Sequence, residues 1–83
     1  MSDTLTDLDI EKSVDSRGSA CPGPLLEAKR AIASVSKGGI MEVLSSDEGT
    51  CDDIPLWCKK VGHEYLGKIE EAGHWRLFVR RMK

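Results

Sequence analysis

Cys21 is followed by Pro22, Gly23 and Pro24, which sets a thiol directly before a helix. Each proline holds its own φ at about −65° and disfavours the helical conformation in the residue before it, so Cys21 and Gly23 are expected outside the helix. Pro24 suits the first helical position, where its missing N–H costs no intrahelical hydrogen bond. The motif therefore predicts a cysteine at the N-terminal entrance of a helix.

A thiol at a helix entrance is a candidate nucleophile. The positive end of the helix macrodipole and the first unpaired N–H groups both favour thiolate over thiol. Arg17 is expected to add electrostatic support nearby. A fall of the thiol pKa from about 8.5 to about 6.5 would raise the thiolate fraction at neutral pH from roughly 3% to roughly 75%. The same field would stabilise a persulfide anion, so Cys21 is predicted to hold a delivered sulfur atom in transferable form.

The residues before Cys21 favour a reactive thiol over a buried one. A lone cysteine is most often a small core hydrophobe. Residues 17–20, however, are Arg, Gly, Ser and Ala, which is typical of an exposed loop rather than a core strand. We therefore predict that Cys21 is the catalytic residue.

The other two cysteines are weaker candidates. Cys58 lies in helical register with Ile54 and is expected to be inert core. Cys51 falls three residues before Ile54 and joins the same face or, if it is exposed near Cys21, acts as a second reactive thiol. A zinc site of Cys51, Cys58 and His63 lacks the Cys-x-x-Cys pair that usually anchors one. We therefore expect no metal and no cofactor.

The composition is that of one small domain. The chain has 83 residues, a formal charge of −2 and 31% charged residues. Its length suits a single core in two layers, and its charge is neither that of a typical nucleic-acid-binding protein nor that of a disordered chain. No apolar run approaches the roughly 20 residues that span a bilayer, and the first residues lack the parts of a signal peptide. We therefore expect a cytoplasmic protein with reduced thiols and no membrane attachment.

Hydrophobic periodicity predicts four strands and two helices. Residues 1–9 have little to bury and are expected to form a flexible tail before a single domain at 10–83. The expected strands are 10–15, 40–44, 63–70 and 74–81. The expected helices are 24–35 and a second one from position 50 to position 60 or 61, ended by Gly62.

Some details of these elements can also be predicted. Thr50 is expected to cap the second helix, and Pro55 is expected to make its start irregular. In the third strand, Tyr65 and Ile69 should share one face, with Gly67 between them as a bulge.

The order strand-helix-strand-helix-strand-strand predicts an α+β fold. A right-handed crossover through the first helix would make the first two strands parallel. The last two strands would form an antiparallel hairpin around Ala72 and Gly73.

Three short motifs occur along the chain: Asp15-x-x-Gly18-x-x-Cys21-Pro22-x-Pro24, Asp53-Ile54-Pro55 and Gly62-His63-Glu64. Together they resemble the TusA/SirA family of small sulfur carrier proteins over about residues 12–81. The resemblance implies a two-layer sandwich in which two helices cover one face of a four-stranded mixed sheet, in agreement with the element order. It also implies that Cys21 carries sulfur, as a persulfide or a thiosulfonate. The sulfur would come from a rhodanese-like protein or a cysteine desulfurase and pass to an acceptor protein.

The resemblance assigns roles to the residues around the thiol. Pro22 and Pro24 would shape the loop of Cys21, and Gly18 and Asp15 would support the approach to it. Both supporting residues also have a purely structural interpretation. Asp15 would accept N–H groups of the loop, and Gly18 would supply a positive φ.

Relatives of this kind serve several pathways, and the sequence favours none of them. Some feed tRNA thiolation or molybdenum cofactor synthesis, and others take part in sulfur oxidation. Whether such a carrier is an enzyme is a matter of definition, because its cysteine is both catalyst and cargo site. The alternative is a regulatory or protein-binding module of the same fold without thiol chemistry.

Positive charge gathers in the last ten residues, which hold Arg76, Arg80, Arg81 and Lys83 and no acid. We hypothesise that Arg76 and Arg80 dock an acidic sulfur donor or acceptor. Direct nucleic-acid binding is disfavoured, because no aromatic-rich platform accompanies these cations. A solvated strand edge is the remaining alternative.

Overall fold

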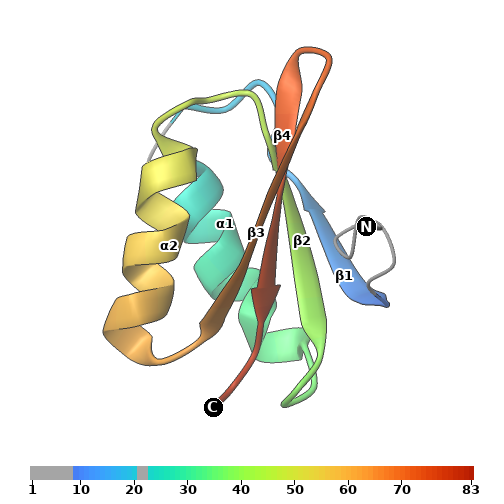
Figure 1. Ribbon diagram of the computed structural model, residues 1–83, viewed down its shortest axis with the longest axis vertical. Helices are drawn as coiled ribbons and strands as arrows, with labels where there is room; N and C mark the ends of the chain where they lie inside the picture. The colour runs from blue at the N-terminus through green and yellow to red at the C-terminus, as the bar shows by residue number, and fades with distance from the viewer. Residues whose placement is uncertain (1–8, 21–22) are drawn as a thin grey trace.

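The computed structural model describes residues 9–20 and 23–83, and these form a four-stranded sheet covered on one side by two helices (Figure 1). The elements are β1 (Ile10–Asp15), α1 (Gly23–Ala31), the 3₁₀ helix η1 (Ile32–Ser34), β2 (Ile40–Ser45), α2 (Thr50–Val61), β3 (Glu64–Glu71) and β4 (His74–Arg80). This order confirms the predicted α+β sandwich. The expected tail lies, up to position 8, outside the described residues.

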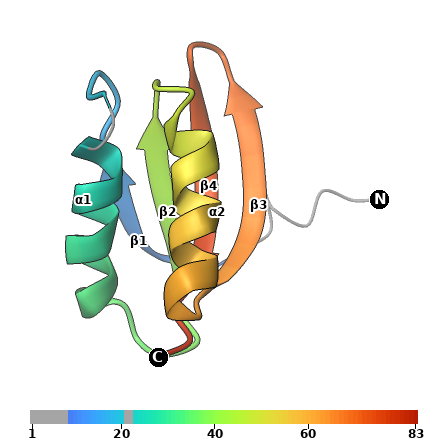
Figure 2. The same ribbon diagram turned by 90° about the vertical axis from the view of Figure 1, so that its left-hand side faces the viewer.

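The strand order in the sheet is β1-β2-β4-β3. β1 is parallel to β2, whereas β4 is antiparallel to both β2 and β3, as the element order predicts. Because the carboxyl ends of two parallel strands meet at the same edge, the β1–α1 and β2–α2 loops lie at one end of the molecule (Figure 2). This end of the sheet positions the candidate site.

The core lies between the helices and one face of the sheet. It is built from alternate strand residues and from one stripe of each helix, as period-two and helical patterns require. The buried core residues are Val14, Ala28, Ile32, Val35, Met41, Val43, Ile54, Trp57, Cys58, Leu77 and Val79. Burying one Val, Leu, Ile or Met side chain stabilises the fold by about 1.5–3 kcal/mol, so the two layers are held together mainly by this cluster.

The first helix differs from its prediction at both ends. Gly23 is its first residue, so Pro24 takes the second position, where it is buried. The α-helix stops at Ala31 and tightens into η1, and Val35 is extended with φ −92° and ψ 137°. Arg81 from the C-terminal segment donates to the carbonyl of Val35 at 2.6 Å, which satisfies a helix-end acceptor from outside the helix.

The start of α2 corrects the prediction for Thr50. The N-cap residue is Gly49, and Thr50 is a fully buried helical residue whose Oγ1 accepts a hydrogen bond from Ser45 at 3.0 Å. Thr50 is thus held inward by the end of β2 and makes no N-terminal cap. The helix is also continuous through Pro55, and the tightened backbone lies before it, where the N–H groups of positions 50–52 donate three residues back. Gly62 ends the helix with φ 95°, as predicted.

A bulge in β3 reverses the expected pattern of its faces. The register shifts between Tyr65 and Gly67, which confirms a bulge at this point. Tyr65 lies opposite Val79 and packs against the core, but Ile69 lies opposite Arg76. The extra residue therefore places Tyr65 and Ile69 on opposite faces, so the prediction of a shared face is wrong.

Candidate functional site

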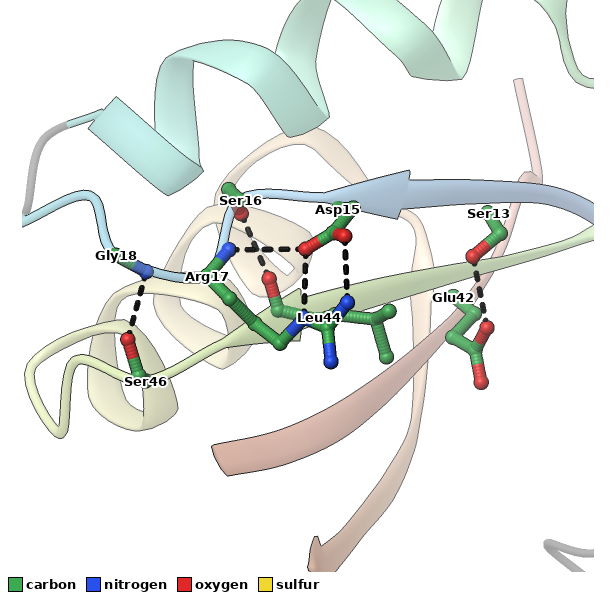
Figure 3. Close-up of polar contacts among 8 residues, drawn as sticks. All are labelled: Ser13, Asp15, Ser16, Arg17, Gly18, Glu42, Leu44 and Ser46. Carbon is green, nitrogen blue, oxygen red and sulfur yellow. Dashed lines mark hydrogen bonds and ion pairs between the residues drawn. The ribbon is translucent and has the colours of Figure 1, made fainter. Parts of the chain in front are cut away.

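The end of β1 is fastened to the end of β2 through Ser16. Ser16 is buried, and both its N–H and its hydroxyl donate to the carbonyl of Leu44 at 2.9 Å. Figure 3 shows the hydroxyl contact. Ser19 closes the following turn by donating its N–H to the Ser16 carbonyl at 3.2 Å. The loop that leads to Cys21 therefore starts from a fixed point on the sheet.

Gly18 adds a second tie between the two loops. Its N–H donates to Oγ of Ser46 at 2.8 Å, which joins the β1–α1 loop to the β2–α2 loop (Figure 3). Its φ is +86°, and a Cβ at this position would meet no atom within 4 Å. The backbone conformation, rather than a lack of space, thus requires glycine here, and the expected positive φ is observed.

Asp15 and Arg17 form an ion pair across the same turn. The two guanidinium contacts measure 2.9 Å to Oδ1 and 2.7 Å to Oδ2, and the N–H of Arg17 also donates to Oδ1 at 3.1 Å (Figure 3). The side-chain hydrogen bond from Arg17, then its backbone hydrogen bond, lowers the pKa of Asp15 to about 2. Asp15 therefore accepts a loop N–H, as expected. The guanidinium of Arg17, however, is engaged by Asp15.

The residues on either side of the candidate nucleophile are joined by a hydrogen bond. Cys21 and Pro22 themselves lie outside the described residues. Gly23, the first residue of α1, donates its N–H to the carbonyl of Ala20 at 2.9 Å. In sequence, Cys21 comes two residues before a helix whose N-terminal dipole favours anions, and Pro24 is buried in the first turn of that helix.

Cys51 and Cys58 are both buried in the core side of α2. The two residues are 8% and 1% exposed, respectively. Burial raises the pKa of Cys51 and raises the pKa of Cys58 to about 11. The predicted core position of Cys58 is confirmed, and Cys51 joins the same face rather than the surface. Within residues 9–20 and 23–83, no group of three or more His, Cys, Asp or Glu side chains is arranged to hold a metal ion.

Arg76 and Arg80, the expected docking residues, are paired inside the chain. Arg76 donates to Glu42 at 2.6 Å and lies 3.6 Å from Glu71, and Arg80 pairs with Glu64 at 2.9 Å. Arg76 also stacks on the ring of Phe78, with 5.3 Å from its Cζ to the ring centroid. Partner docking through these arginines stays a prediction, and it would compete with these internal pairs.

Sequence reasoning missed the contribution of two serines to this site. Ser16 and Ser46 hold the loop through hydrogen bonds to residues 28 positions away in sequence. The available signal is the polar Ser45-Ser46 pair, which follows the apolar part of β2, because the ends of adjacent parallel strands meet at one edge.

Most of the chain is similar to known proteins. The family model for Sulfurtransferase TusA matches residues 12–81. The chain belongs to the TusA family. The sulfur carrier protein TusA of Pseudomonas entomophila is 35% identical over 77 residues, which cover 93% of this chain and 96% of that protein. A protein of Archaeoglobus fulgidus is 49% identical over 70 residues, which cover 84% of this chain and 96% of the relative.

A solved structure shares the TusA-like fold seen here. The SirA-like protein of Desulfitobacterium hafniense aligns with a TM-score of 0.70 and 23% sequence identity, over 87% of this chain and 99% of that one. The resemblance to the TusA/SirA family and the predicted fold are thus confirmed. Neither helix in the described part of the chain has the length and apolar composition needed to cross a membrane.

Proposed function

We propose that this protein holds sulfur as a persulfide on Cys21 and passes it between a donor protein and an acceptor protein. The observation that carries the proposal is the contrast among its three cysteines. Cys51 and Cys58 lie in the core with raised pKa values, which opposes thiolate formation. Cys21 instead comes, in sequence, two residues before α1, whose N-terminus favours a thiolate. Membership of a sulfur carrier family supports the same role.

The chemistry is thiol–persulfide exchange and needs no cofactor. The Cys21 thiolate attacks the outer sulfur of a donor persulfide, a new S–S bond forms, the donor S–S bond breaks, and the donor thiolate leaves. An acceptor nucleophile then attacks the outer sulfur on Cys21, and the Cys21 thiolate is released. Each step exchanges one S–S bond for another bond to the same sulfur, so the carrier returns to its starting state.

The donor in this proposal is a rhodanese-like protein or a cysteine desulfurase. The acceptor is a protein of sulfur oxidation or of tRNA thiolation and cofactor sulfuration. The carrier domain is residues 10–83 and works in the cytoplasm. A thiosulfonate is the alternative cargo, since it is also held on a cysteine thiol.

Capping Cys21 tests this role against that of a binding module. We would treat the native protein with iodoacetamide, which the buried Cys51 and Cys58 should resist. We would then load capped, uncapped and Cys21→Ser protein with polysulfide. The uncapped protein should release about one sulfide per chain on reduction, and the other two should release none. A capped protein that still releases sulfide would place the sulfur on another thiol. An uncapped protein that binds no sulfur would favour the binding module.

A further inference from the structure

A groove of ≈ 540 Å³ lies between α1 and α2, outside the loop site described above. Its apolar lining comes from Leu25 of α1 and from Leu56 and Trp57 of α2. Leu56 is 64% exposed, the largest exposure among the exposed large hydrophobic residues of the described chain. Most of this side chain lies outside the core, so it is available to an apolar group from outside.

Three lysines surround this lining: Lys29, Lys59 and Lys60. All three are exposed, and within residues 9–20 and 23–83 none of them forms an ion pair. Arg76 and Arg80, in contrast, are both paired with glutamates. The groove lining therefore carries three lysines against a single acidic residue, Asp53, although the whole chain carries a formal charge of −2.

Helix electrostatics explains only part of this arrangement. Lysines in the last turn of a helix complement its dipole, and all three lysines are so placed. The dipole does not explain why these lysines surround an exposed leucine and a largely buried tryptophan. An apolar strip with a cationic rim matches an amphipathic segment with carboxylates along its edges.

We propose that this groove docks an acidic, amphipathic segment of the protein that exchanges sulfur with Cys21. Apolar side chains of the segment lie on Leu25, Leu56 and Trp57, and its carboxylates pair with the lysines. Leu25 is the third residue of α1, so the groove begins beside the helix entrance that Cys21 precedes. The inference rests on the proposed function for the identity of the partner. It is an alternative to the Arg76 and Arg80 surface as the docking face.

The test uses a labelled acidic peptide with leucines at helical spacing and glutamates beside them. Its binding is measured by fluorescence anisotropy on the full chain carrying Cys21→Ser, so the result does not depend on sulfur chemistry. We expect binding that weakens at high salt and falls at least about tenfold in the Lys29→Glu/Lys60→Glu variant. Leu56→Ala should also weaken binding, with little dependence on salt.

The matched control is Lys37→Glu/Lys68→Glu, which changes the charge equally at exposed positions outside the groove. It should bind like the parent protein, and NMR shifts induced by the peptide should fall on α1 and α2. Docking at the groove would be contradicted by any of three results: no binding to the parent protein, an equal loss of affinity in both double variants, or NMR shifts on β4. Polysulfide loading of Cys21 in the Lys29→Glu/Lys60→Glu protein should stay normal. A failure to load there and in wild type would instead reject the carrier role.

Discussion

Arg17 holds the carboxylate of Asp15 by two side-chain contacts and one backbone N–H, all within the turn that leads to Cys21. Both side chains are about half exposed, at 49% and 53%, yet the contact is enough to bring the pKa of Asp15 to about 2. The pair fixes the turn, and the positive charge of Arg17 is neutralised by Asp15. We therefore propose that a low pKa of Cys21 would depend mainly on the α1 N-terminus and less on Arg17.

The Asp15–Arg17 pair predicts a pH dependence. A carboxyl whose folded pKa is lowered contributes stability above its unfolded value near 3.8, and this contribution is lost as pH falls through about 2. NMR titration of the Asp15 carboxyl should show ionisation near 2 in wild type and a rise toward 3.8 in Arg17→Gln. Arg80→Gln is the control and should leave Asp15 unchanged. Ionisation of wild-type Asp15 near 3.8 would contradict the ion pair.

Gly18→Ala should destabilise the turn before Cys21. An alanine with φ near +86° costs about 1–2 kcal/mol, and the loss is measurable by urea unfolding. Gly73→Ala is a matched control in the β3–β4 turn, outside the β1–α1 loop, because Gly73 has φ +84° and an added Cβ would likewise meet no atom within 4 Å. Both variants should lose similar stability, but only Gly18→Ala should alter the alkylation rate of Cys21. An alkylation rate in Gly18→Ala equal to that of wild type would show that the turn does not influence the reactivity of Cys21.

Cys58 should behave as a packing residue. Cys58→Ser buries a hydroxyl at a site that is 1% exposed, which should lower the free energy of unfolding by about 1–3 kcal/mol. Cys58→Ala adds no polar atom and serves as the comparison in the same urea titration. Polysulfide loading at Cys21 should be normal in both variants. Loss of loading in the stably folded Cys58→Ala protein would show that this thiol takes part in the chemistry.

The single tyrosine of the chain reports on the packing of β3. Burial, with smaller contributions from Cys51 and Cys58, raises the pKa of Tyr65 to about 12. Because the folded state disfavours the phenolate, stability should fall as pH rises from the unfolded value of 10 toward 12. Absorbance at alkaline pH should show tyrosinate forming near pH 12 in the native protein and near 10 in urea. Native titration near 10 would mean that Tyr65 does not pack on the core.

The regular parts of the fold could be predicted because their signals are local. In β4, Leu77 and Val79 alternate with Arg76 and Arg80, and the structure buries the first pair in the core. Gly67 could be recognised as a bulge, but not its effect on Ile69. One extra residue moves every following side chain to the other face of the strand, so period-two reasoning carried through the bulge fails beyond it.

The candidate site was less predictable because its ties cross long stretches of sequence. Gly18 and Ser46 meet only because β1 and β2 are parallel neighbours. The pairing of Arg76 likewise depends on Glu42, which is 34 residues away. In the sequence, Arg76 belongs to a C-terminal group of basic residues that contains no acid. Only the register of β4 against β2 shows that Glu42 lies close enough to pair with it.

The central claim is that Cys21 alone carries sulfur, and peptide-level mass spectrometry tests it most directly. Wild type would be incubated with polysulfide, with rhodanese plus thiosulfate, or with cysteine desulfurase plus cysteine, then trapped and digested. We expect a reductant-labile gain of about 32 Da per sulfur, or about 112 Da for a thiosulfonate, on the Cys21 peptide only. Sulfur on the Cys51 or Cys58 peptide, or on none of the three with every donor, would contradict it.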